Sequence, residues 1–219
     1  MHTEQIRHAL DDALSGRHLL THPFYRRWEA GTLGEGELAA YAEQYRLIEQ
    51  ALPETLSAIA AGLPPGVART LVEGNLADEV AVPEAHTALF ESFARAAGAR
   101  PAIGSTPATA ALLDAVRAAS AADPVAALAM VAAYEVQAAD IAASKAEGLR
   151  RHYGMDGSGT AFWDVHVTQE VAHADWSIDA LAALDADPVT VRAAARVATD
   201  AWWNFLSERE ERALQAAAR

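Results

Sequence analysis

The sequence predicts an all-α protein that folds as a single domain. Alanine is abundant and long runs of β-branched residues are rare, which favours helices over strands. Three residue pairs have the form of a helix N-cap followed by a proline in the first turn. These pairs are Thr106-Pro107, Asp123-Pro124 and Asp187-Pro188. The chain of 219 residues can bury one substantial core, and no stretch rich in Ser, Gly or Pro is long enough to be a linker, so we expect one domain over residues 1–219.

Punctuation along the chain separates nine helical segments. The first segment is amphipathic and carries acids. Between the fourth and fifth segments, Pro83 should break or kink the chain at Val82. The proline pairs begin the sixth, seventh and ninth segments, and the loop from Gly154 to Gly159 separates the seventh from the eighth. The expected segments are residues 3–15, 22–30, 35–62, 66–80, 84–98, 107–121, 124–153, 159–183 and 188–217.

Composition excludes several classes of function. There is no cysteine, so disulfides and thiol chemistry are excluded and an oxidising compartment is not indicated. Thirty acidic against 17 basic residues give a net charge of −13, which repels phosphate backbones and anionic lipid surfaces. The N-terminus, MHTEQIRHALDDAL, lacks the apolar region of a signal peptide, and no segment has the length of a membrane span. We expect a cytoplasmic protein that binds neither nucleic acid nor a membrane.

Five possible metal ligands are spaced so that each group can share one helix face. An α-helix turns about 100° per residue, so seven residues come within roughly 20° of two full turns. Glu79 and His86 would therefore stack on one side of a continuous helix, although a proline between them weakens this argument. His166, Glu170 and His173 fall at i, i+4 and i+7, which places all three on a single stripe.

A sixth possible ligand, Glu135, follows the apolar run of residues 124–134. That run should be buried all round, and a carboxylate there is costly unless a cation or hydrogen bonds compensate it. Three carboxylates and three imidazoles without a thiolate suit iron or manganese better than a structural zinc. Six ligands are too many for one open ion, whereas two ions sharing them keep positions for oxygen or substrate. For any one residue, the alternative is an ordinary core or surface role.

Lys145 is the only lysine, because the other 16 basic residues are all arginine. A guanidinium is always charged and is a poor nucleophile, whereas a buried lysine can lose its proton and donate nitrogen. Lys145 lies ten residues after Glu135, about 80° from the face of that ligand, so it would flank the site without being a ligand. The alternative is that a single lysine survives by chance in an arginine-biased composition.

Six short stretches together resemble one family over nearly the whole chain. They are His22-Pro-Phe-Tyr25, LAAYAEQYR with Tyr41 and Tyr45, NLADE ending at Glu79, YEVQ at Glu135, SKAEGL at Lys145, and His166-x3-Glu170-x2-His173. In order and spacing they resemble the haem-oxygenase-like di-iron oxidases, which are related to the TenA and PqqC folds. Within this superfamily the sequence is most similar to the CADD family of folate-associated proteins. One departure is Glu170, where the CADD pattern favours aspartate.

The resemblance implies a bundle of seven or more helices that encloses two iron ions, or an iron/manganese pair, and activates O₂ with an external reductant. It also implies synthesis of 4-aminobenzoate from the protein's own side chains, with Tyr25 as the sacrificed ring and Lys145 as the nitrogen source. Tyr41 and Tyr134 are candidates to carry oxidising equivalents to that ring, and Trp176 is a candidate to line the pocket. For each aromatic residue the alternative is core packing. A homodimer is compatible with such a bundle.

Two other hypotheses remain open. The first is a di-iron oxygenase that acts on an external small molecule, such as an amino acid or a fatty acid, by C–C cleavage or N-oxygenation. The second is a non-catalytic helical binding module in which the ligand set is vestigial.

Overall fold

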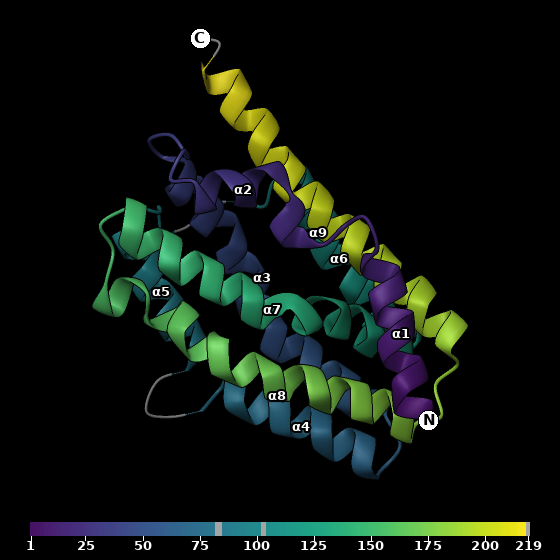
Figure 1. Cartoon of the computed structure of the whole chain (residues 1–219). Coiled ribbons are helices and arrows are strands. Elements are labelled where there is room, and N and C mark those ends of the chain that lie inside the picture. The colour runs from purple at the N-terminus through teal and green to yellow at the C-terminus, as the bar shows by residue number, and fades with distance from the viewer. Residues whose placement is uncertain (82–84, 102–103, 218–219) are drawn as a thin grey trace.

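A computed structural model describes residues 1–81, 85–101 and 104–217, and within them the chain is helical with no strand (Figure 1). The all-α prediction is confirmed. In chain order the elements are α1 (His2–Leu14), η1 (Leu19–Thr21), α2 (Pro23–Glu29), α3 (Glu37–Gly62), α4 (Val67–Glu79), α5 (His86–Ala96), α6 (Pro107–Ala122), α7 (Pro124–His152), η2 (Gly157–Gly159), α8 (Ala161–Ala183) and α9 (Pro188–Ala217). The ends of these nine α-helices agree with the predicted segments to within two residues. Val82 and Pro83 lie outside the described residues.

All three proline pairs begin a helix in the predicted way, and two of the three N-cap side chains make capping hydrogen bonds. The Asp123 carboxylate accepts hydrogen bonds from the backbone N–H groups of Val125 and Ala126, at 3.0 and 3.2 Å. Asp187 caps α9 in the same manner. Thr106 is the N-cap of α6 with Pro107 in the first turn, as predicted, but its side chain makes no capping hydrogen bond. Its hydroxyl instead donates to Glu208 of α9, at 2.5 Å, so it ties two helices together.

The helix α7 runs through the middle of the bundle and packs along α8 and α9 (Figure 1). Among the described residues it is the one helix long and apolar enough to cross a membrane by length and composition, and 67% of its most apolar window is buried inside the protein. The expectation that no segment has that length was therefore too strict. Burial of this kind is typical of a core helix, because α7 is covered by protein on several sides.

Two hydrophobic clusters make up the core, and a polar layer lies between them. The first cluster joins α1 and α4 to the C-terminal part of α3, the N-terminal half of α7, the end of α8 and the start of α9. The second joins α2 and α5 to the opposite ends of those same long helices. The middle turns of α3, α7 and α8 therefore carry buried polar side chains toward one another. This layer is where the candidate ligands lie.

Candidate metal centre

The six predicted ligands are all buried in the polar layer, each residue being between 1% and 7% exposed. They come from the end of α4, the start of α5, the middle of α7 and the middle of α8. Three of them, Glu79, His86 and His166, present one ligand atom each within 4.8 Å of the others. That spacing is short enough for a single metal ion to contact all three.

Glu79 and His86 meet across a break between helices, not along one helix. Glu79 is the last residue of α4 and His86 is the first of α5, so the stacking argument from a continuous helix was wrong. The two side chains are nevertheless in contact, with His86 Nδ1 at 2.8 Å from Glu79 Oε2. Burial lowers the pKa of His86, but the hydrogen bond and charge of Glu79 raise it by more, so the pKa lies above its usual value. The other ring nitrogen, Nε2, contacts the side-chain oxygen of Gln169 at 2.8 Å.

The predicted stripe on α8 places His166, Glu170 and His173 together. His166 Nε2 lies 3.8 Å from one oxygen of Glu170, and His173 Nδ1 lies 3.9 Å from the other. The Nδ1 of His166 donates to the backbone carbonyl of Phe162 at 2.6 Å, which leaves Nε2 free to act as a ligand. Burial lowers the pKa of His166 to about 4, so the ring is neutral, as a metal ligand requires. His173 Nε2 contacts the carboxylate of Asp78 at 3.3 Å, a pairing that orients the ring.

Two hydrogen bonds from neighbouring helices offset the cost of burying the Glu135 carboxylate. Asn75 of α4 donates to one carboxylate oxygen at 2.7 Å, and Ser177 of α8 donates to the other at 2.5 Å. Burial raises the pKa of Glu135 to about 7 in spite of these donors. Sequence reasoning missed both donors, although Ser177 follows His173 by four residues and so continues the same stripe.

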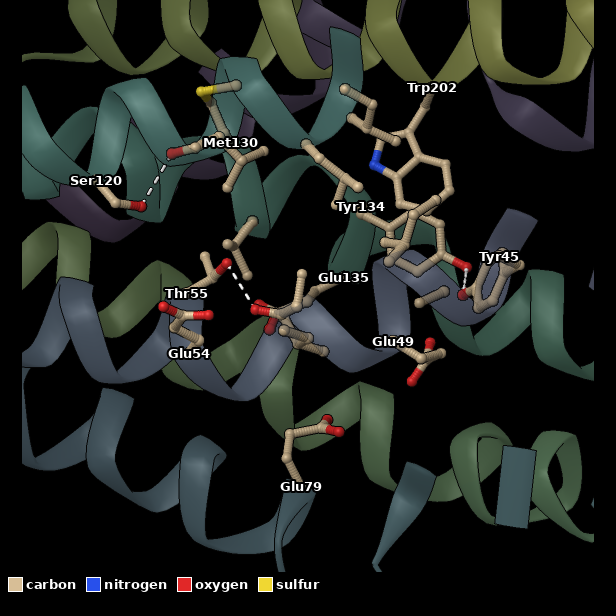
Figure 2. Close-up of a pocket in the computed structure, with 18 of the residues that line it drawn as sticks. Tyr45, Glu49, Glu54, Thr55, Glu79, Ser120, Met130, Tyr134, Glu135 and Trp202 are labelled. Carbon is tan, nitrogen blue, oxygen red and sulfur yellow. Dashed lines mark hydrogen bonds between the residues drawn. The ribbon is translucent and has the colours of Figure 1, made fainter. Parts of the chain in front are cut away.

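A cavity of about 280 Å³ has a carboxylate-rich wall at this layer. Figure 2 shows Glu79 and Glu135 on opposite sides of one space, with a further acid, Glu49 of α3, beside them. Glu170 and His166 complete this wall, and His86 and His173 reach it through their contacts with Glu79 and Glu170. Sequence reasoning missed Glu49, because α3 carries several acids and no histidine at ligand spacing.

The donor set fits a metal centre. Burial raises the pKa of Glu170 well above its usual value, and the charges of the neighbouring acids raise it further. One oxygen of Glu170 and one of Glu49 are buried without any hydrogen-bond partner in the described part of the chain. Unpartnered buried carboxylate oxygens are costly in a protein interior, and a bound cation offsets that cost. Oxygen and imidazole ligands without sulfur are suited to iron or manganese.

A second buried cluster contains the lysine and the predicted tyrosines. Lys145 is 1% exposed, and its Nζ donates to the hydroxyl of Tyr41 at 2.6 Å. The Tyr41 hydroxyl also contacts the hydroxyl of Tyr25 at 3.0 Å, so the three side chains form one hydrogen-bonded chain. Burial lowers the pKa of the Lys145 amine well below its usual value, against the opposing effect of the Glu49 carboxylate.

The tyrosine cluster reaches the metal-ligand group through a second hydroxyl pair. Tyr45 and Tyr134 have their hydroxyl oxygens 2.7 Å apart, and both line the cavity (Figure 2). The ring of Tyr45 lies 5.4 Å from that of Tyr41, and Tyr134 directly precedes Glu135 in α7. Tyr45 thus lies between the two clusters.

Trp176 does not line the cavity in the described part of the chain. Its ring packs on His173, with centroids 5.7 Å apart, and approaches Gly74 of α4. On the helix Trp176 lies about 60° from His173 and about 120° from Glu170, so it stands at the edge of the ligand stripe, on the side that faces α4. The cavity therefore gives no support to the pocket role expected for Trp176, which stays a prediction.

The bundle and its interior group of carboxylates and imidazoles define a protein of haem-oxygenase-like fold with a candidate non-haem metal centre. A metal centre of this kind can support redox chemistry. The chain belongs to the family described as iron-containing redox enzyme, whose family model matches residues 39–204. It is an oxidoreductase of that family, and the family indicates iron as its metal.

Curated relatives are similar over most of the chain. A 4-aminobenzoate synthase from Nitrosomonas europaea is 37% identical, covering 94% of this chain and 91% of the relative. A 4-aminobenzoate synthase from Chlamydia pneumoniae is 30% identical, covering 90% of this chain and 92% of the relative. The resemblance to CADD proteins is thereby confirmed.

Solved structures share the fold at low sequence identity. A CADD-like protein of unknown function from Nostoc punctiforme matches with a TM-score of 0.80 and 16% identity, over 97% of this chain and 99% of that one. A TenA homologue from Pseudomonas syringae pv. tomato matches with a TM-score of 0.79 and 14% identity, over 94% of this chain and 92% of that one. At these identities the likeness concerns the fold alone.

Proposed function

We propose that this protein is a di-iron oxidase that makes 4-aminobenzoate from its own side chains, with Tyr25 as the source of the ring and Lys145 as the source of the nitrogen. The observation that carries this proposal is the buried chain from Lys145 through Tyr41 to Tyr25. Its support comes from the two curated relatives, which are 4-aminobenzoate synthases.

The metal ions would be held by Glu79, His86 and His166, whose ligand atoms lie within 4.8 Å of one another, together with Glu135, Glu170 and His173. When bound, two iron ions supply oxidising equivalents from O₂, with electrons from an external reductant. The protein keeps the side chains of both clusters buried, which limits their contact with bulk water.

Lys145 has the properties required of a nitrogen donor. A primary amine is a nucleophile only when it has lost its proton, and burial keeps the Lys145 amine neutral at a pH where an exposed lysine is charged. Its Nζ lies 4.9 Å from the centre of the Tyr25 ring and 4.0 Å from that of Trp163. The aromatic walls therefore confine the amine next to the ring that is to be modified.

The tyrosine hydroxyls can pass a proton when a ring is oxidised. Burial raises the pKa of Tyr25, Tyr41, Tyr45 and Tyr134, so all four phenols are protonated at neutral pH. Loss of an electron from a buried phenol is easiest when its proton moves at the same time to a hydrogen-bonded neighbour. Tyr41 supplies such a neighbour to Tyr25, and Tyr45 and Tyr134 supply one to each other.

The test uses the protein with no organic substrate. Purified apoprotein is loaded with Fe(II) and exposed to O₂ and a reductant, and released small molecules and digested protein are analysed by mass spectrometry. We expect no more than one 4-aminobenzoate per chain, with loss of the side chain at Tyr25 and alteration at Lys145. Tyr25→Phe should release none, whereas the control Tyr153→Phe, which removes a hydroxyl that accepts from the backbone of Leu33 and bonds to neither cluster, should behave as the wild type. O₂ consumption with both residues intact would reject the proposal.

A second candidate function is favoured by the cavity itself. Away from its acidic wall the cavity is lined by apolar side chains, among them Leu52, Leu112, Val116 and Met130. Its volume of about 280 Å³ suits a small organic molecule. An oxygenase acting on such a molecule would turn over many times per chain and would leave Tyr25 intact. The mass-spectrometric experiment separates the two candidates.

A further inference from the structure

Glu49 is a buried acid that none of the six predicted ligands accounts for. It lies on α3, which contributes no other candidate ligand, and its side chain is 6% exposed. It forms part of the cavity wall together with Glu79 and Glu135 (Figure 2), and Glu170 lines the same cavity. An acid in such a place needs a partner, because an ionised carboxylate loses its hydration on burial.

The described residues give one oxygen of Glu49 no such partner. That carboxylate oxygen, Oε2, is buried without a hydrogen bond, and no arginine, lysine or histidine among the described residues lies within ion-pair distance of Glu49. Burial raises the pKa of Glu49 well above its usual value and the charge of Glu79 adds to that rise, whereas the charge of Lys145 and the hydroxyl of Tyr45 act against it. Glu49 therefore lies between the carboxylates of the centre and the cluster that contains Lys145.

The helix α3 directs Glu49 into the centre. Tyr41, Tyr45 and Glu49 are spaced four residues apart, so they form one stripe along the face of α3 that turns toward the interior. Pro53 follows one turn later, within the same helix, and has no N–H to bond the carbonyl of Glu49. The acid is thus the last member of a stripe that begins in the tyrosine cluster and ends among the carboxylates.

We propose that Glu49 is a metal ligand, the fourth carboxylate of the centre, supplied by α3. A divalent cation shared with Glu79 or Glu170 would satisfy the unpartnered oxygens and remove the repulsion among the acids. The inference rests on the proposed function insofar as it assumes a metal pair, but it adds a residue and a helix to the ligand set. It also gives α3, which carries Tyr41 and Tyr45, a direct connection to the metal.

The test measures metal binding and stability, not catalysis. Mn(II) is titrated into wild type, Glu49→Gln and Glu54→Gln apoprotein, and free Mn(II) is followed by electron paramagnetic resonance. Glu54 is a matched control, because it lies on the same helix at the exposed edge of the cavity. We expect wild type and Glu54→Gln to bind two ions alike, and Glu49→Gln to bind at least one of them about tenfold or more weakly.

Thermal unfolding without metal distinguishes lost ligation from damage to the fold. Glu49→Gln removes a charge from an acidic cluster, so its apoprotein should unfold at the same temperature as the wild type or higher, while the rise on adding Mn(II) shrinks. If Glu49→Gln fails to fold, Glu49→Asp, which withdraws the carboxylate by one methylene, is titrated in its place, with the same weakening expected.

Two results would overturn the inference in different ways. Binding of both ions by the Glu49 variant with wild-type affinity would mean that Glu49 is not a ligand, and that its carboxylate instead serves the buried amine of Lys145. Failure of the wild type to bind Mn(II) or Fe(II) at all would reject the metal centre itself, and with it the proposed function.

Discussion

The buried amine of Lys145 should make the stability of the apoprotein depend on pH in a way that one substitution removes. The perturbation is Lys145→Met, which replaces the amine with an apolar side chain of similar length. Burial holds the pKa of Lys145 well below the value of 10.5 that describes an exposed lysine. Between those two values the unfolded chain carries a proton on this lysine that the folded chain does not.

The sign and the size of the effect follow from proton linkage. Since the unfolded state binds more protons in this window, the free energy of unfolding of the wild type rises with pH, by up to about 1.4 kcal/mol per pH unit from this group. From pH 7 to pH 9 the contribution of Lys145 is therefore at most about 2.7 kcal/mol. The window ends near pH 10, where unfolded tyrosines ionise while the buried ones resist ionisation.

The assay is urea unfolding of chelator-treated protein at several pH values from 7 to 9. Buried acids with raised pKa values contribute slopes of the opposite sign, so the quantity to compare is the difference between wild type and Lys145→Met at each pH. We expect Lys145→Met to be the more stable of the two at pH 7, and its advantage to shrink as the pH rises. Arg117→Met, at a side chain that is 70% exposed, is the control with no such trend. A difference that does not change with pH would show that Lys145 is charged in the folded protein.

Three further substitutions probe the two clusters. Ser177→Ala removes one of the two donors to Glu135, so it should lower the free energy of unfolding of the apoprotein by about 1–3 kcal/mol in urea titrations; an unchanged value would mean that water replaces the hydroxyl. Tyr41→Phe removes the hydroxyl that links Lys145 to Tyr25, so single-turnover product yield should fall at least about tenfold while iron content stays at the wild-type level. Equal loss of iron would assign Tyr41 to the metal centre instead. Trp176→Phe should leave both iron content and product yield unchanged, because that ring packs on α4 outside the cavity.

Helix periodicity was enough to predict the part of the centre that lies on one helix. The spacing of His166, Glu170 and His173 placed them on one stripe, and the structure has them in contact along α8. Glu79 and His86 were paired for the wrong reason, because they belong to two helices whose ends meet. The rule for a continuous helix does not describe a pair of helix ends, so this contact depends on how α4 and α5 pack.

The site residues that could not be predicted from the sequence were missed for a shared physical reason, which is that their roles depend on how the helices pack. Glu49 belongs to a helix with several other acids, and only the packing of α3 against α7 decides which of them faces the interior. Asn75 is recognisable as a partner of Glu135 only once α4 and α7 are placed, since 60 residues separate the two in the chain. Ser177, by contrast, continues the α8 stripe and was within reach of the same arithmetic that identified His173.

The polar layer between the two hydrophobic clusters has a consequence for the life of this protein in a cell. A chain that folds when iron is scarce must close its two apolar halves around a group of buried acids, so we expect the polar layer to open more often than the hydrophobic clusters on either side of it. Ligand binding to the folded state alone suppresses such opening by mass action. Iron supply should therefore set how long each copy survives proteolysis, and a cell starved of iron would keep few idle copies of the enzyme.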